Sequence, residues 1–130
     1  MLLDTSAYSA YVDGSAAVFQ RLDETLSVSF PLAVIAEIRK GFLGGTRRQE
    51  NETILQGFMQ MTGAEIVLPT IETADYFAEL WMFCRKKGRV LSDNDLWIAT
   101  TALETGETLL TLDKDFVVFD GYEGLAIIVL

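Results

Sequence analysis

The stretch Ser92–Leu103, which reads SDNDLWIATTAL, predicts a helix that carries an acid on its buried face. At 3.6 residues per turn, Asp95 shares one side of this helix with Ile98 and Ala102. That side is otherwise apolar, and a carboxylate that faces a core is unfavourable unless it is paired or protonated. A purely structural interpretation stays open, because Ser92 and Asp95 also fit a capping box at a helix N-terminus, where negative charge is favoured.

The composition is that of a folded chain, and we expect residues 1–130 to form a single domain. Hydrophobic residues make up 50% of the sequence, which is enough for a substantial core. No apolar run is long enough to span a membrane, and we expect no secretory leader. The single cysteine, Cys84, cannot form an internal disulfide, so we expect a cytoplasmic protein without membrane contact.

Histidine is absent from the sequence, and its absence excludes several kinds of site. Ser–His–Asp and Cys–His catalysis, histidine zinc sites and histidine general bases all need a residue that this chain lacks. Any bound metal must therefore be held by oxygen ligands, which favours a hard cation such as Mg²⁺ or Mn²⁺.

The chain is strongly acidic, with a formal net charge of −9 at pH 7. This charge argues against a generic nucleic-acid-binding surface. Most of the basic residues nevertheless gather in two groups, which are Arg39, Lys40, Arg47 and Arg48, and Arg85, Lys86, Lys87 and Arg89. In one interpretation the two groups are local phosphate contacts. In the other they are solvated residues that complement the dipoles of helix C-termini.

Strand-like and helix-like segments alternate along the chain, which predicts a parallel α/β sheet covered by helices on both faces. The expected strands are Leu2–Leu3, Leu26–Phe30, Glu65–Leu68, Thr108–Leu112 and Leu125–Leu130. The expected helices are Ala7–Val12 with a cap at Thr5–Ser6, Ala16–Leu22, Leu32–Phe42, a helix opened by Thr46–Thr53, one from Thr70 to about Lys87, Ser92–Glu104 and a short turn at Asp115–Val118.

Four acidic residues fall where ligands bind in such sheets, beyond the carboxyl ends of the strands. Asp4 and Asp113 each follow a strand. Glu37 lies on the helix after the second strand, and Asp95 opens the helix before the strand of Asp113. Two like charges about 4 Å apart repel by roughly 4 kcal/mol at an effective dielectric constant of 20. A cluster of four is tolerable only if cations neutralise it or some members bind protons, so the pattern favours a Mg²⁺ or Mn²⁺ site.

Four runs of sequence together resemble the PIN domain, and specifically the VapC- and FitB-like toxin ribonucleases. The runs are LLDTSAY at residues 2–8, LAVIAEIRKG at 32–41, DNDLWIATTAL at 93–103 and TLLTLDKDF at 108–116. They span nearly the whole chain and occur in the order of the family. The resemblance implies a PIN-like three-layer α/β/α fold, with a central, mostly parallel sheet of about five strands covered by helices.

The resemblance also assigns roles to particular residues. It makes Asp4, Glu37, Asp95 and Asp113 the catalytic, metal-binding acids, and Asp115 an additional candidate ligand. The alternative for Asp115 is a structural charge at the N-terminus of a short helix. The candidates for positioning the substrate are Thr5, Ser6 and Thr111 beside the acids, and Arg39, Lys40, Arg85, Lys86 and Lys87 in the basic groups.

The function that the resemblance implies is that of a Mg²⁺- or Mn²⁺-dependent endoribonuclease, the toxin of a type II toxin–antitoxin module. Such an enzyme hydrolyses RNA phosphodiester bonds with a metal-activated water. The resemblance further implies a homodimer and a cognate VapB-like antitoxin. The alternative is a non-catalytic PIN-like module that binds RNA or a partner protein, which would keep the fold and show no cleavage.

Overall fold

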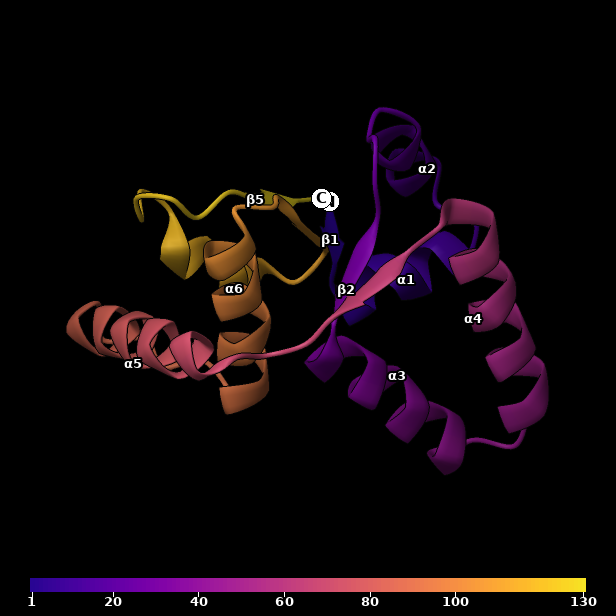
Figure 1. Ribbon diagram of the computed structural model, residues 1–130, viewed down its shortest axis with the longest axis horizontal. Helices are drawn as coiled ribbons and strands as arrows, with labels where there is room; N and C mark the ends of the chain where they lie inside the picture. Colours follow the sequence, from indigo (N-terminus) through magenta and orange to yellow (C-terminus); the bar gives the residue numbers. More distant parts are fainter.

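The computed structural model describes residues 1–130 as helices packed around one parallel sheet (Figure 1). The sheet has five strands in the order β3-β2-β1-β4-β5, and every pair of neighbours is parallel. The strands are β1 (Leu2–Leu3), β2 (Ser29–Pro31), β3 (Glu65–Val67), β4 (Leu109–Thr111) and β5 (Ile127–Val129). The α/β/α architecture with a parallel sheet that the sequence predicts is therefore confirmed.

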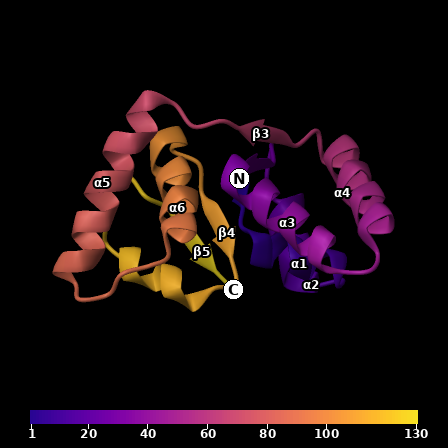
Figure 2. The ribbon, with the colours of Figure 1, turned by 90° about the horizontal axis from the view of Figure 1, so that it is seen from below.

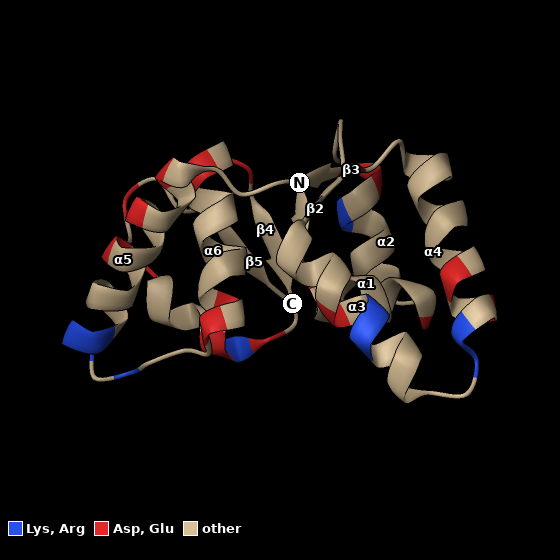
Figure 3. Ribbon diagram, turned by 60° about the horizontal axis from the view of Figure 1, so that its bottom comes forward, with Lys and Arg blue, Asp and Glu red and all other residues tan.

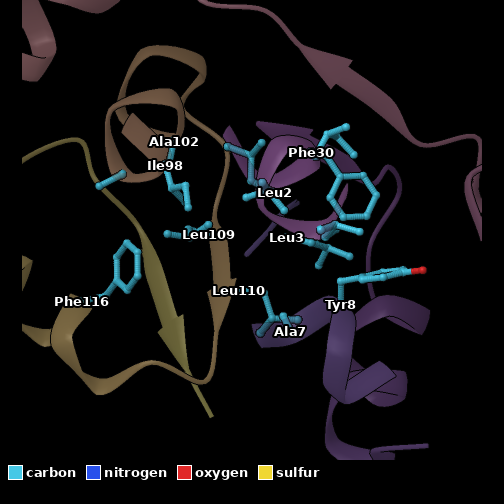
Figure 4. Close-up of a cluster of buried hydrophobic side chains, with 14 of the residues drawn as sticks. Leu2, Leu3, Ala7, Tyr8, Phe30, Ile98, Ala102, Leu109, Leu110 and Phe116 are labelled. Carbon is cyan, nitrogen blue, oxygen red and sulfur yellow. The ribbon is translucent and has the colours of Figure 1, made fainter. Parts of the chain in front are cut away.

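The central strand β1 and its neighbour β4 form the middle of the core. Leu2 pairs with Leu109 and Leu3 with Leu110, and all four side chains are fully buried. Strands that are apolar on both faces need helices on both faces, which is how parallel sheets are normally covered. Figure 4 shows Ile98 of the sixth helix on one side of these leucines and Tyr8 of the first helix on the other.

The helices fall into two groups on opposite sides of the molecule in two views (Figures 1 and 2). One group holds α5 (Ile71–Lys86) and α6 (Asp93–Thr105). The other holds α1 (Thr5–Val12), α2 (Ala16–Asp23), α3 (Leu32–Gly44) and α4 (Arg48–Thr62). A 3₁₀ helix, η1 (Lys114–Phe119), follows β4. No helix combines the length and the apolar composition that crossing a membrane would need.

Sequence signals explain where the site-bearing helix begins and ends. Ser92 is the N-cap of α6, and its hydroxyl accepts a hydrogen bond from the backbone N–H of Asp95 at 3.1 Å. Gly106 ends the helix in the left-handed conformation, with φ of 69°. Ile98 and Ala102 are fully buried, as their spacing predicts.

Several local predictions are wrong. Asp4, rather than Thr5 or Ser6, is the N-cap of α1, and its carboxylate accepts from the N–H of Thr5. Strand β2 starts at Ser29 instead of Leu26, whose side chain is fully exposed. The helical spacing of Ile54, Met61 and Ile71 predicts that they face the core, but all three are exposed, because α4 and α5 each use only part of their apolar face against the core.

Candidate active site

Four acids from four elements gather at the carboxyl edge of the sheet. Asp4 follows β1, Asp113 follows β4, Glu37 lies on α3 and Asp95 lies in the first turn of α6. Burial raises the pKa of the Asp95 carboxyl, a hydrogen bond from Ser92 opposes this rise, and the negative charges of the other three acids raise the pKa further. The Asp95 carboxylate thus lies close enough to each of the other three acids for their charges to act on it. Figure 3 shows acidic positions at the start of α6 and after β4, at the lower edge of the sheet.

Asp4 is the most deeply buried of the four, with 5% of its surface exposed. Its Oδ1 accepts a hydrogen bond from the N–H of Thr5 at 2.7 Å. Its Oδ2 accepts from the hydroxyl of Ser6 at 2.6 Å and from that of Thr111 at 2.7 Å. Neutral donors therefore orient this carboxylate, and none of them neutralises its charge.

The hydroxyls of Ser6 and Thr111 also fix the segment that carries Asp113. The Ser6 hydroxyl accepts from the N–H of Leu112 at 2.9 Å, and the Thr111 hydroxyl accepts from the N–H of Asp113 at 2.9 Å. The two hydroxyls lie 3.1 Å apart. A small polar network thus ties the ends of β1 and β4 together and sets where Asp4 and Asp113 lie relative to each other.

The remaining acids are oriented in the same manner. The hydroxyl of Thr5 donates to Glu37 Oε2 at 2.5 Å, and the hydroxyl of Ser92 donates to Asp95 Oδ2 at 2.6 Å. The capping interpretation of Ser92 therefore holds together with the placement of Asp95 among the other acids. Thr5, Ser6 and Thr111 are predicted to position the substrate. In the structure each of their hydroxyls donates a hydrogen bond to one of the acids.

No basic group forms an ion pair with any of the four acids. The ion pairs of the structure lie elsewhere: the N-terminal ammonium with Glu107, Arg21 with Glu24, Arg39 with Glu52, Arg47 with Glu50, and Arg89 with Asp115. The carboxyl edge consequently holds negative charge that no side chain of this chain neutralises.

The donor set at this edge fits a hard divalent cation in its chemistry, since all the donors are carboxylate or hydroxyl oxygens. In their present positions, however, no three of the acids converge tightly enough to hold one ion. Each carboxylate is turned toward a hydroxyl or an N–H, as the bonds to Glu37 and Asp95 show. Binding a cation would therefore require some of these side chains to turn inward.

The basic residues predicted to hold substrate are occupied by other contacts or project into solvent. Arg39 pairs with Glu52 of α4, and the Arg85 guanidinium lies 5.2 Å from the centre of the Trp81 ring. Lys87 donates to the backbone carbonyls of Val118 and Asp120 at 2.8 and 3.2 Å and lies over the ring of Phe83. Lys40 and Lys86 are exposed. None of the five is bonded to the acids.

Asp115 and Arg89 form a contact that the sequence did not reveal. The carboxylate of Asp115 pairs with Arg89, while its backbone N–H donates to Asp113 Oδ1 at 2.8 Å. The sequence placed Arg89 in a basic group without connecting it to the acids. The only available signal was Gly88, which marks the end of α5 and the start of a connection that leads to Asp95.

Comparison with known proteins agrees with this geometry. A family model described as the PIN domain matches residues 1–122. Ribonuclease VapC5 of Mycobacterium tuberculosis is 29% identical to the chain over 130 residues, covering 98% of this chain and 93% of the relative. Among solved structures, VapBC2 of Rickettsia felis bound to a promoter DNA fragment superposes with a TM-score of 0.85 at 22% identity, over 99% of this chain and 97% of that one. The VapBC-5 toxin–antitoxin structure from M. tuberculosis gives a TM-score of 0.76 at 26% identity, over 99% and 97%.

Proposed function

Because the chain belongs to the PIN-domain family, we propose that it is a divalent-metal-dependent endoribonuclease and the toxin of a type II toxin–antitoxin pair. The observation that carries the proposal is the cluster of four acids without a basic partner at the carboxyl edge of the sheet. The similarity to a protein named as a ribonuclease, over 98% of the chain, supports the same reaction.

The four acids supply carboxylate oxygens, which are the ligands that a hard divalent cation prefers. We assign Asp4, Glu37, Asp95 and Asp113 to a Mg²⁺ or Mn²⁺ site. Such an ion, when bound, lowers the pKa of a water molecule and stabilises charge on the phosphodiester. The hydroxyls of the chain orient the carboxylates: Ser6 and Thr111 hold Asp4 Oδ2, and Thr5 holds Glu37 Oε2.

A protein partner forms the second part of the proposal. The solved structures that this chain resembles include toxin–antitoxin complexes, and we propose that this chain likewise binds a VapB-like antitoxin and forms a homodimer. Leu26 and Met61 support a partner surface, because both are exposed and line the same surface pocket. Light scattering of the isolated chain should give twice the monomer mass of 14.4 kDa.

The direct test is cleavage of a mixed small-RNA pool with Mg²⁺ or Mn²⁺. We expect wild-type protein to cut the pool, and Asp4→Asn and Asp95→Asn each to reduce the rate by about a thousandfold. Asp75→Asn is the matched control, because Asp75 is an exposed acid on α5 outside the cluster. Equal activity in the wild type and in both site variants would refute the assignment of the acids.

The alternative is a non-catalytic PIN module that binds RNA or protein. One observation favours it, namely that no three acids converge on a single ion in the positions that they hold. The alternative predicts RNA binding without cleavage in either metal, under conditions where the far-ultraviolet circular dichroism shows a folded chain.

A further inference from the structure

The connection between α5 and α6 places an arginine beside the candidate active site. Arg89 forms an ion pair with Asp115. Asp115 follows Asp113 by two residues, and its backbone N–H donates to Asp113 Oδ1 at 2.8 Å. The guanidinium of Arg89 is thus held at the rim of the acidic cluster, by the segment that carries one of its four acids.

The backbone of Arg89 is fixed at this place by the end of α5. Gly88 adopts a φ of 72°, its N–H donates to the carbonyl of Arg85 at 3.0 Å, and the N–H of Arg89 donates to the carbonyl of Cys84 at 3.0 Å. This pair of bonds is the Schellman arrangement that closes a helix. Ser92, the N-cap of α6, follows three residues later. Arg89 therefore lies on a short connection that is anchored at both ends.

The ion pair itself is weak enough to be exchanged. The side chains of Arg89 and Asp115 are 53% and 55% exposed, and solvent screens such pairs so that they add little to the stability of the fold. A guanidinium binds a phosphate group through two parallel hydrogen bonds. A phosphate bound in this way can displace a single carboxylate. Exchange of Asp115 for another anion would therefore leave the fold intact.

Arg89 differs in this respect from the other basic residues that have partners. Lys87 is tied to backbone carbonyls of η1, and Arg39 pairs with α4. Lys114 adjoins Asp113 in sequence and is exposed, but no contact fixes its side chain. Only Arg89 combines a fixed backbone, an exchangeable partner and a place next to the acids.

We propose that Arg89 is a substrate-positioning residue that binds an RNA phosphate next to the one that is cleaved, and that Asp115 holds its guanidinium in place before RNA binds. This assignment rests on the proposed ribonuclease function. The role of Arg89 is to offset the repulsion between a polyanionic substrate and an acidic site, in a protein whose net charge is −9.

The test compares Arg89→Gln and Arg89→Lys with the control Arg21→Gln, since Arg21 also pairs with an acid, Glu24, but on α2. For Arg89→Gln we expect KM for RNA to rise about tenfold with kcat within about twofold. The slope of log K against log salt for RNA binding without metal should fall by about 0.7. Arg89→Lys should recover part of the affinity, and Arg21→Gln should match the wild type.

Two further variants separate this role from a structural one. Asp115→Asn frees the guanidinium and is expected to tighten metal-free RNA binding about twofold, whereas a merely structural ion pair predicts weaker binding, as in Arg89→Gln. If Lys114→Gln raises KM and Arg89→Gln does not, the assignment is wrong while the ribonuclease function stands. If the wild type neither binds nor cleaves RNA, the proposed function fails and this assignment fails with it.

Discussion

The carboxylates at the two edges of the parallel sheet have opposite kinds of partner. At the amino edge, Glu107 accepts hydrogen bonds from the N-terminal ammonium at 2.8 Å and from the hydroxyl of Ser29 at 2.7 Å. At the carboxyl edge, four carboxylates meet with hydroxyl and N–H donors but without a cation. An acid that serves the fold is neutralised within the chain. Acids without such a partner leave charge available for a ligand.

The pKa shifts express the same contrast. Burial raises the pKa of the Glu107 carboxyl, but the hydrogen bonds from the N-terminal ammonium and from Ser29 outweigh burial and hold the pKa below its ordinary value. Burial also raises the pKa of Asp95, where the single hydrogen bond from Ser92 does not outweigh burial and the neighbouring acids. Ionised Glu107 therefore stabilises the fold, whereas ionised Asp95 destabilises it.

The largest stability change is expected from Thr111→Val at the carboxyl edge. Thr111 is fully buried, and its hydroxyl serves both Asp4 Oδ2 and the N–H of Asp113. Removing the hydroxyl leaves a buried carboxylate and an N–H short of partners, so we expect a loss of about 2–3 kcal/mol of unfolding free energy. Urea denaturation measures the loss, and Thr111→Ser should restore most of it. A stable Thr111→Val variant would show that the network is not needed to hold the edge.

A smaller loss is expected from Glu107→Gln at the amino edge. This change removes the ion pair with the N-terminal ammonium, and because Glu107 is 28% exposed we expect a loss of about 1 kcal/mol. RNA cleavage should be unaffected, since Glu107 lies at the edge opposite to the acids. Loss of cleavage in a folded Glu107→Gln protein would contradict the claim that Glu107 serves the fold alone and that only the acids at the carboxyl edge serve cleavage.

The pH dependence of this loss has a definite sign. Because the pKa of Glu107 is lowered on folding, its contribution is complete at neutral pH and declines as the pH falls below about 4.5, the ordinary value, and through the lowered pKa. The difference in unfolding free energy between wild type and Glu107→Gln should therefore shrink in acid. A difference that stays constant from pH 7 to pH 3 would contradict the role of the charge.

The smallest effect, and one of opposite sign, is expected from Asp95→Asn. The substitution removes one of four mutually repelling charges and keeps an oxygen that can accept from Ser92. We expect unfolding free energy without metal to rise by roughly 0.5–1 kcal/mol, although cleavage is lost. Thermal unfolding in a chelator is the measurement. Destabilisation instead would mean that Asp95 serves the fold through its capping position.

Local patterns were enough to predict the features that depend on neighbours in sequence. The periodicity of Ile98 and Ala102 gave the buried face of α6. For acids far apart in sequence a rule of topology was needed: parallel strands share a carboxyl edge, which places Asp4 and Asp113 at the same end of the sheet, where Thr111 links them. The alternation of strands and helices gave the sheet. The assignment of the four acids to metal and catalysis stays a prediction.

Individual side-chain contacts between residues far apart in the sequence could not be predicted. Arg89 and Asp115 are separated by 26 residues, and the N-terminus and Glu107 by 106, so no local spacing links them. The exposure of Leu26 has a similar origin. Its apolar alternation is typical of a strand, but the strand pairing of β2 with β1 and β3 begins at Ser29.

Binding of Mn²⁺ to the isolated chain tests most directly whether the carboxyl edge is a cation site. Free Mn²⁺ would be followed by electron paramagnetic resonance during titration of wild type, Asp95→Asn and Glu107→Gln. We predict that wild type and Glu107→Gln bind the ion and that Asp95→Asn loses this binding. Equal binding by Asp95→Asn and wild type, or no binding by any of the three, would contradict the account.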